Sequence, residues 1–332
     1  MRRDGYRHAY ATRLNAFRAD AARAFPGRNR IGTAELLARA ATVPGLSAVD
    51  LNFPDHLDGL APGDVAAQLA GHGLGLNGFA MRYGADPAFR GGALAHPDPA
   101  LRARAVDLTR RGLDALLAAG GSLLTIWPGQ DGFEYPLATD YGRAWDALAD
   151  SLARIAAHAP EAAIALEPKP DEPRARALLR DSATALLLVA EVGAPNLGVT
   201  LDVAHALYAG ETPAEAATLI ARRSRLLGVH LNDGYGRRDD GLVTGSVHPL
   251  QILDLLLALD RIGYRGPLYF DTFPDAAGLD PVRETALNIA AAEALTRALD
   301  RLKADPLHAE AVARGDALAA LGRAQAALFG AG

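Results

Sequence analysis

Four apolar runs in the second half of the chain each carry an acidic side chain or a histidine at or next to their end. These residues are Glu167, Asp202, His230 and Asp271. Neighbouring strands of a parallel sheet lie ~4.8 Å apart, so side chains at the ends of successive strands converge. Crowded carboxylates repel one another unless a cation lies among them, and carboxylate with imidazole suits Mg²⁺, Mn²⁺ or Co²⁺. The four residues are therefore predicted to bind one divalent metal ion, although a single acid at such a place is more often a helix cap or an ion-pair partner.

A second cation site is also predicted near the first. His205 lies one turn beyond Asp202, and the loop of residues 234–242 carries Asp239 and Asp240. These side chains offer ligands for a second ion, with Asp202 or His230 as a bridge. The alternatives are that His205 is a buried histidine with satisfied hydrogen bonds and that the two aspartates belong to a solvated loop.

Lys169 is singled out because the chain otherwise uses arginine for almost every cation. Of the 34 basic residues only Lys169 and Lys303 are lysines, and Lys169 lies two residues beyond Glu167. An arginine would present a wide planar fork, whereas lysine places a compact donor beside a ligand oxygen. Lys169 is therefore predicted to act in the chemistry and to contact the substrate, the alternative being an ordinary surface lysine.

Composition excludes several classes of function. The chain has 332 residues and no cysteine, which rules out disulfides, thiolate nucleophiles and cysteine-bound zinc. The net charge is −5 without a long Lys/Arg run, so nucleic acid and anionic membranes are not expected partners. No segment reaches the ~20 apolar residues that span a bilayer, no signal-peptide pattern follows Met1, and no glycine-rich nucleotide-binding motif is present. A cytoplasmic enzyme is expected.

The elements that would position these side chains alternate along the chain as in a parallel sheet with crossover helices. Eight such units favour an α/β fold of the (β/α)8 TIM-barrel type over residues 1–303. The predicted strands are His8–Leu14, Ala48–Phe53, Leu74–Met81, Ser122–Trp127, Ala162–Glu167, Leu197–Asp202, Leu226–Leu231 and Pro267–Asp271. The predicted helices are Thr33–Thr42, Pro62–His72, Pro99–Ala119, Tyr141–His158, Arg174–Val192, Thr212–Arg222, Pro249–Ile262 and Val282–Leu302.

Residues 304–332 form a separate alanine-rich segment after the barrel. Leu318, Leu321 and Leu328 are spaced as on one face of a helix. The segment is too short to be a domain and too apolar to extend freely into water. It is predicted to be a C-terminal helical arm packed on the barrel or on a neighbouring subunit, which favours a homo-oligomer, a dimer or a tetramer.

Three segments resemble the xylose isomerase-like barrels, a family that includes xylose isomerase and L-rhamnose isomerase. Residues 167–174, EPKPDEPR, resemble the strand-five signature and differ mainly at Asp171, where asparagine is usual. Residues 127–132 resemble the tryptophan-bearing strand-four loop, and residues 87–92 resemble the strand-three loop that supplies a phenylalanine. The similarity extends from about Ser47 to Asp275. It implies that Trp127 and Phe89 are apolar walls against a sugar, the alternative being ordinary core aromatics.

The ligand set departs from the family pattern at defined places. Asp202, His205 and His230 are more similar to L-rhamnose isomerase than to xylose isomerase, where strands six and seven typically supply glutamate and aspartate. Asn52 stands where xylose isomerase has the histidine credited with ring opening, and His56 lies nearby. Both are predicted to contact the substrate. The family's Asp-x-Asp pair becomes Asp239-Asp240 followed by glycine, which leaves open which oxygens hold a second metal.

The resemblance implies an aldose–ketose isomerase acting on a small sugar by a metal-assisted hydride shift between carbons 1 and 2. In this interpretation Lys169 donates to the carbonyl oxygen, and Asp239 or Asp240 takes part in moving the hydroxyl proton. One alternative is a ketose 3-epimerase, which uses one metal and two opposed carboxylates, with a strand-eight glutamate where this chain has Asp271. Others are a lyase or dehydratase acting on a sugar-derived ketone, and a non-catalytic barrel that binds sugar or serves in an assembly.

Overall fold

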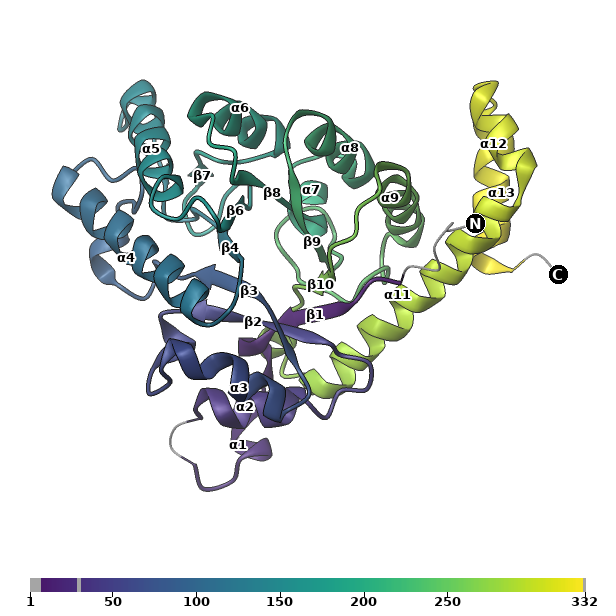
Figure 1. The fold of residues 1–332 in the computed structure, drawn as a ribbon. Helices are drawn as coiled ribbons and strands as arrows, with labels where there is room; N and C mark the ends of the chain where they lie inside the picture. Colours follow the sequence, from purple (N-terminus) through teal and green to yellow (C-terminus); the bar gives the residue numbers. More distant parts are fainter. Residues whose placement is uncertain (1–6, 29–30, 331–332) are drawn as a thin grey trace.

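Eight parallel strands close into a barrel in the computed structural model, which describes residues 7–28 and 31–330 (Figure 1). The order around the barrel is β1-β10-β9-β8-β6-β4-β3-β2, and β1 pairs with both β2 and β10. Every strand of the barrel falls inside one of the eight predicted runs, so the predicted TIM barrel is confirmed. The strands are β1 (Tyr10–Arg13), β2 (Ala48–Phe53), β3 (Gly75–Met81), β4 (Leu123–Ile126), β6 (Ala163–Leu166), β8 (Leu197–Asp202), β9 (Leu226–Leu231) and β10 (Leu268–Phe270).

Helices surround the barrel and follow the strands in sequence (Figure 1). Several begin at an aspartate whose carboxylate accepts a hydrogen bond from a backbone N–H of the first turn, as at Asp98, Asp140 and Asp280. The main helices are α2 (Thr33–Ala40), α3 (Val65–Gly71), α4 (Pro99–Ala118), α5 (Tyr141–Ala156), α6 (Ser182–Val192), α8 (Pro213–Arg223), α9 (Pro249–Ile262) and α11 (Pro281–Ala304). Shorter ones are α1 (Ala21–Ala24), α7 (Val203–Tyr208) and α10 (Pro274–Ala277).

One predicted helix boundary is wrong. The helix expected over Arg174–Val192 begins only at Ser182, as α6. The preceding residues form β7 (Arg176–Ala177), which pairs antiparallel with β5 (Gly132–Phe133) beside the barrel mouth. Asp181 ends this extended segment because its side chain accepts from the backbone N–H of Thr184 and caps α6.

Residues of each strand alternate between the barrel interior and the layer beneath the helices. On β4, Leu124 and Ile126 are fully buried in the hydrophobic core, whereas Thr125 lines a cavity at the mouth of the barrel. The same alternation along the other strands directs polar side chains to this cavity. The fold therefore gathers polar groups at the carboxyl ends of the strands.

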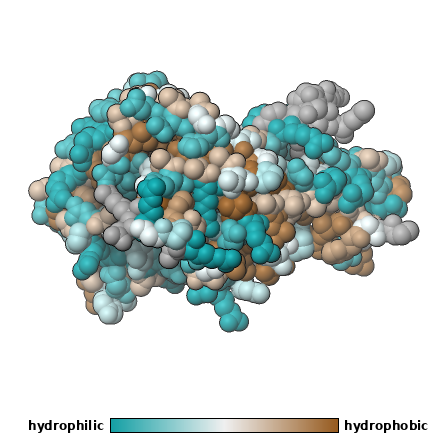
Figure 2. Space-filling view, turned by 90° about the horizontal axis from the view of Figure 1, so that it is seen from below, coloured by the Kyte–Doolittle hydropathy of each residue, from teal (hydrophilic) through white to brown (hydrophobic). Residues whose placement is uncertain are grey.

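The C-terminal arm consists of α12 (Pro306–Ala313) and α13 (Ala317–Phe329), at the right of Figure 1. It packs on its own barrel, since α13 contacts α9 and α11 and the Arg301 Nε donates to the Ala327 carbonyl at 2.9 Å. The predicted apolar face of the arm is only partly buried, because Leu318 is 82% exposed. Figure 2 shows hydrophobic patches at the surface at this end of the molecule. The homo-oligomer stays a prediction.

Within the part of the chain that the structure describes, no helix combines the length and the apolar character required to span a bilayer. The outermost residues of the two predicted domain ranges, 1–6 and 331–332, lie outside the described residues.

Candidate functional site

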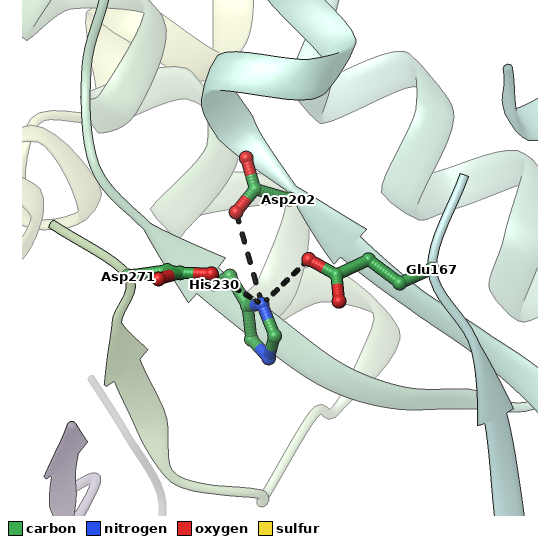
Figure 3. Close-up of side chains that lie close together, drawn as sticks. All are labelled: Glu167, Asp202, His230 and Asp271. Carbon is green, nitrogen blue, oxygen red and sulfur yellow. Dashed lines mark hydrogen bonds and ion pairs between the residues drawn. The ribbon is translucent and has the colours of Figure 1, made fainter. Parts of the chain in front are cut away.

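The four residues predicted to bind one metal ion lie together at the carboxyl end of the barrel (Figure 3). His230 Nδ1 is 3.1 Å from Glu167 Oε1, 3.7 Å from Asp202 Oδ2 and 3.8 Å from Asp271 Oδ2. The four candidate ligand atoms all lie within 4.8 Å of one another. In an octahedral site with bonds of about 2.1 Å, adjacent ligand atoms are about 3.0 Å apart and opposite ones about 4.2 Å. The spacing therefore fits a single divalent cation.

The electrostatics of this cluster also favour a cation. Burial raises the pKa of Asp202, and despite the opposing effect of His205 the carboxylates of Asp239, Glu167 and Asp271 help to bring it to about 7. Burial alone would lower the pKa of His230, but the neighbouring carboxylates raise it to about 9. The imidazole thus holds a proton that offsets the repulsion among the acids. A divalent ion would take over this role, and oxygen with imidazole is the donor set that Mg²⁺, Mn²⁺ or Co²⁺ prefers.

Asp202 is held in place by a buried asparagine and by the helix that it caps. Asn232 Nδ2 donates to both carboxylate oxygens of Asp202 at 3.1 Å and to the Asp271 carbonyl at 3.0 Å. Asn232 Oδ1 accepts from the Ala204 N–H at 2.7 Å. Asp202 Oδ1 also accepts from the His205 N–H at 3.0 Å, so it caps α7 while Oδ2 faces His230. Such outer hydrogen bonds orient metal ligands.

The residues predicted for a second cation form a group beside the first. His205 Nε2 and Lys169 Nζ lie 3.0 Å and 3.1 Å from Asp239 Oδ2. Among the described residues no hydrogen-bond partner exists for the buried Asp239 Oδ1. The nearby cations lower the pKa of Asp239 to about 2 despite its burial, so it is ionised. Its unsatisfied oxygen is the atom on which the second-cation prediction now depends.

Lys169 is buried in the cavity and is not a surface lysine. Its side chain is 8% exposed, and Nζ also lies 2.9 Å from Glu172 Oε2 and 5.2 Å from the centroid of the Trp127 ring. Burial alone would lower the pKa of Lys169, but Asp239 and Glu172 raise it above its usual value. The ammonium is therefore charged and is positioned between the metal-ligand cluster and the indole of Trp127, which lines the same cavity.

The side chain of Asp240 makes different contacts from that of its neighbour Asp239. Its Oδ2 accepts from the Tyr235 N–H and its Oδ1 from Arg238 Nε, both at 2.8 Å. These bonds brace the loop that Asp233 and Leu242 close through paired backbone hydrogen bonds. The structure thus places Asp239 in the wall of the cavity, whereas Asp240 accepts hydrogen bonds within its own loop, and a role of Asp240 in the chemistry stays a prediction.

Three predicted substrate contacts lie outside the wall of the cavity. His56 is 1% exposed, and its Nδ1 accepts from the Asn52 N–H at 2.9 Å. Asn52 is 6% exposed and belongs to β2. Phe89 is 2% exposed and packs edge-on against Tyr83, with ring centroids 6.2 Å apart. The His56 imidazole and the Phe89 ring have their partners in the core, whereas the substrate contact of Asn52, two residues beyond Asp50 on the same strand, stays a prediction.

The buried position of His56 predicts a specific dependence of stability on pH. Burial, with Arg18 and Arg82, lowers the pKa of His56 to about 3. The unfolded chain, with an ordinary histidine pKa of about 6.5, binds a proton first, so His56 destabilises the fold as pH falls below about 6.5. We expect His56→Gln to remove about 2 kcal/mol of the decrease in unfolding free energy between pH 7.5 and 5.

The measurement is denaturant unfolding at both pH values, with His72→Gln as the control. His72 lies at the end of α3, and its substitution is expected to leave the pH dependence unchanged. Equal pH dependence of the wild type and His56→Gln would mean that His56 is not held neutral in the core.

The cavity has a volume of about 250 Å³ and a wall that the sequence prediction captured only in part. Arg13 Nη1 lies 3.5 Å from Asp271 Oδ1, while Nη2 binds Asp275 at 3.1 Å, so Arg13 holds a metal-ligand candidate in place. Burial raises the pKa of Asp50 to about 6, although Asn77 donates to it at 2.6 Å. The further residues of the wall that were not predicted include Arg82, Glu172 and Tyr269.

Comparison with known proteins assigns the chain to one family. The family model described as "Xylose isomerase-like TIM barrel" matches residues 37–304. The chain belongs to the xylose isomerase-like TIM-barrel family. This agrees with the resemblance of residues 167–174 and with the closed barrel of eight strands.

Individual proteins similar to this chain carry the names of two kinds of sugar enzyme. The xylose isomerase of Thermus thermophilus is 31% identical over 192 residues, which cover 56% of this chain and 50% of that protein. The chain thus spans about half the length of the curated relatives it matches. Among solved structures, an L-ribulose 3-epimerase has a TM-score of 0.67 at 20% identity, covering 88% of this chain and 96% of the other. A D-allulose 3-epimerase from Methylomonas sp. has a TM-score of 0.62 at 21% identity, covering 87% and 97%. These two structures share the fold.

Proposed function

We propose that this chain is a metal-dependent isomerase that interconverts a small aldose and its ketose by a hydride shift between carbons 1 and 2. The observation that carries this proposal is the position of the Lys169 ammonium, in one cavity with Glu167, His230 and Asp271, the members of the metal-ligand cluster that line its wall. The similarity to sequences named xylose isomerase supports the same reaction. A divalent cation bound by the cluster supplies a Lewis acid for the oxygens of the sugar.

The residues of the chain have distinct tasks in this proposal. Lys169 donates a hydrogen bond to the carbonyl oxygen, where negative charge develops as the hydride moves. Asp239, ionised and with a free Oδ1, accepts the proton of the neighbouring hydroxyl and returns it to the former carbonyl oxygen after the hydride has moved. Trp127 provides an apolar face that shields the reacting carbons from water. Arg13 fixes Asp271 through its guanidinium.

A ketose 3-epimerase is the second candidate. The support is that two solved structures with this barrel are named as 3-epimerases and that the carboxylates of Glu167 and Asp271 both face His230. An epimerase moves a proton with two opposed carboxylates. Asp271 is one methylene shorter than the glutamate that the epimerase interpretation expects, and an epimerase has no evident use for Lys169 beside Asp239.

Deuterium incorporation from solvent separates the two candidates. The Mn²⁺-loaded protein is incubated in D₂O with a panel of free aldoses and ketoses, and the products are analysed by NMR. We expect aldose–ketose interconversion with little deuterium on carbons 1 and 2, because a hydride shift retains the transferred hydrogen. Full incorporation at carbon 3 of a ketose would establish the epimerase instead, and release of water or of a cleaved fragment would establish a dehydratase or lyase.

A further inference from the structure

A second cavity adjoins the one that contains the metal-ligand cluster. Its volume is about 230 Å³, and it shares Met81, Arg82 and Trp127 with the first cavity. The rest of its wall consists of Asp55, Tyr83, Gly84, Ala85 and Gln130. A ligand that reaches from the cluster into this space would pass Trp127 and Arg82.

Arg82 stands at the junction of the two cavities and forms no ion pair within the described part of the chain. It directly follows β3, and its backbone N–H donates to the Phe53 carbonyl at 3.0 Å, which fixes its position. The residue is half-buried. Over residues 7–28 and 31–330, no carboxylate lies within the 4.0 Å of an ion pair from its guanidinium. Leaving a partly buried charge unpaired is unfavourable, so a bound anion would stabilise it.

The other two long-chain cations of the main cavity are already neutralised. Arg13 pairs with Asp271 and Asp275, and Lys169 pairs with Asp239 and Glu172. Each of these two cations thus already has two carboxylate partners. The contrast makes Arg82 the cation of this wall that is open to a ligand among the described residues.

The second cavity offers a neutral donor beside Arg82. Gln130 lies across Gly84, since a Cβ at that glycine would come within 2.9 Å of Gln130 Nε2. Tyr83 does not compete, because its hydroxyl is bonded to Thr109 Oγ1 at 2.7 Å. Asp55 is the acid of this wall, and it is solvent-exposed at the rim. A guanidinium with one carboxamide suits a planar carboxylate, which arginine binds with two parallel hydrogen bonds.

We infer that Arg82, at the junction of the two cavities, binds a carboxylate at the end of the substrate remote from the reacting carbons, so that the substrate is a sugar acid of the uronate type. This inference rests on the proposed sugar isomerase function and specifies its substrate class. A phosphate group, with more charge and no planar fork, is the competing anion.

Binding of matched sugars to the Mn²⁺-loaded protein tests the inference without requiring turnover. Isothermal titration calorimetry compares D-glucose, D-glucuronate and D-glucose 6-phosphate, and likewise D-galactose and D-galacturonate. We expect at least one uronate to bind about tenfold or more tightly than its neutral sugar, as for a charge-assisted hydrogen bond. Arg82→Gln should abolish this difference between the acid and the neutral sugar.

Arg90→Gln is the matched control, because Arg90 is an exposed arginine of the following loop and lines neither cavity. It should keep the full preference for the uronate. Equal affinity for acid and neutral sugar, no uronate binding at millimolar concentration, or a preference that survives Arg82→Gln would overturn the inference. Tighter binding of the 6-phosphate than of the uronate would overturn the assignment to a carboxylate.

Turnover measured in the same samples separates this inference from the proposed function. Uronates that bind through Arg82 but undergo no aldose–ketose interconversion would support the carboxylate site and contradict the isomerase. Interconversion of neutral aldoses without any preference for the acids would support the isomerase and contradict the carboxylate site.

Discussion

Removal of the divalent cation by EDTA is expected to abolish turnover, and Mn²⁺ or Co²⁺ is expected to restore it. The four candidate ligand atoms lie within 4.8 Å of one another and can share one cation. In the proposed mechanism the cluster acts on the sugar through that cation, so its removal stops the reaction. The cation should also stabilise the fold, because a ligand at 100 times its Kd adds about 2.7 kcal/mol to the unfolding free energy. Thermal unfolding with and without Mn²⁺ measures this effect. A protein that turns over at full rate after EDTA treatment refutes the metal mechanism.

Asp202→Asn is the single substitution that tests the metal mechanism most directly. It removes the carboxylate that lies between His230 and His205, and we expect Mn²⁺ affinity to fall at least about a hundredfold, with turnover near background. Burial and neighbouring carboxylates raise the pKa of Asp202 to about 7, so the ionised side chain destabilises the metal-free fold at pH 8. The amide relieves this, and the metal-free variant should be no less stable than the wild type. Asp146→Asn, on the exposed face of α5, is the control.

The barrel was predictable because its strands are short apolar runs that alternate with helices, a pattern that survives without any knowledge of tertiary contacts. Each of the eight runs contains a strand, and β2, β8 and β9 match their predicted bounds. The start of α6 was not predictable in this way. Residues 174–181 have helix-forming composition, but the pairing of β7 with β5 overrides that local preference.

The metal-ligand cluster was predictable because the rule behind it is geometric: polar residues at the carboxyl ends of barrel strands share one mouth. The same rule, applied to the first half of the chain, points to Arg13 at the end of β1 and Arg82 directly after β3. Both line the cavity, and neither was predicted, because arginine offers only hydrogen-bond donors and cannot bind a metal ion. Asp50 was missed for another reason, since it lies within β2 and only the strand's alternation turns it inward.

Loop side chains were the least predictable part of the site. Asp239 and Asp240 are adjacent and chemically identical, yet one faces the cavity and the other accepts hydrogen bonds within its own loop. Phe89 and His56 likewise lie close to the mouth in sequence but turn into the core. Which way such a side chain turns depends on hydrogen bonds and packing partners that come from distant parts of the chain. The periodicity of the sequence does not indicate which distant residues these partners are.

Lys169→Met is expected to leave Mn²⁺ binding intact and to lower turnover at least a hundredfold. The lysine is not among the four clustered ligand candidates, so calorimetric Mn²⁺ affinity should change little. Its Nζ is the donor placed for the carbonyl oxygen of the sugar, and loss of such a donor costs about 3 kcal/mol of transition-state stabilisation. Lys169→Arg should fail almost as severely, because a planar fork does not fit between Asp239, Glu172 and the Trp127 ring.

The other lysine of the chain provides the matched control. Lys303 lies on α11 and pairs with Asp260, outside the cavity wall, so Lys303→Met should lose some stability but no more than a few-fold in kcat. Unfolding midpoints for both variants establish that each is folded under assay conditions. Protonated His205 still neutralises Asp239 in Lys169→Met, which keeps the cavity intact while the donor is gone. If Lys169→Met instead retains turnover within a few-fold of the wild type, the lysine has no part in the chemistry, and the case for hydride transfer over proton transfer at this site loses its main support.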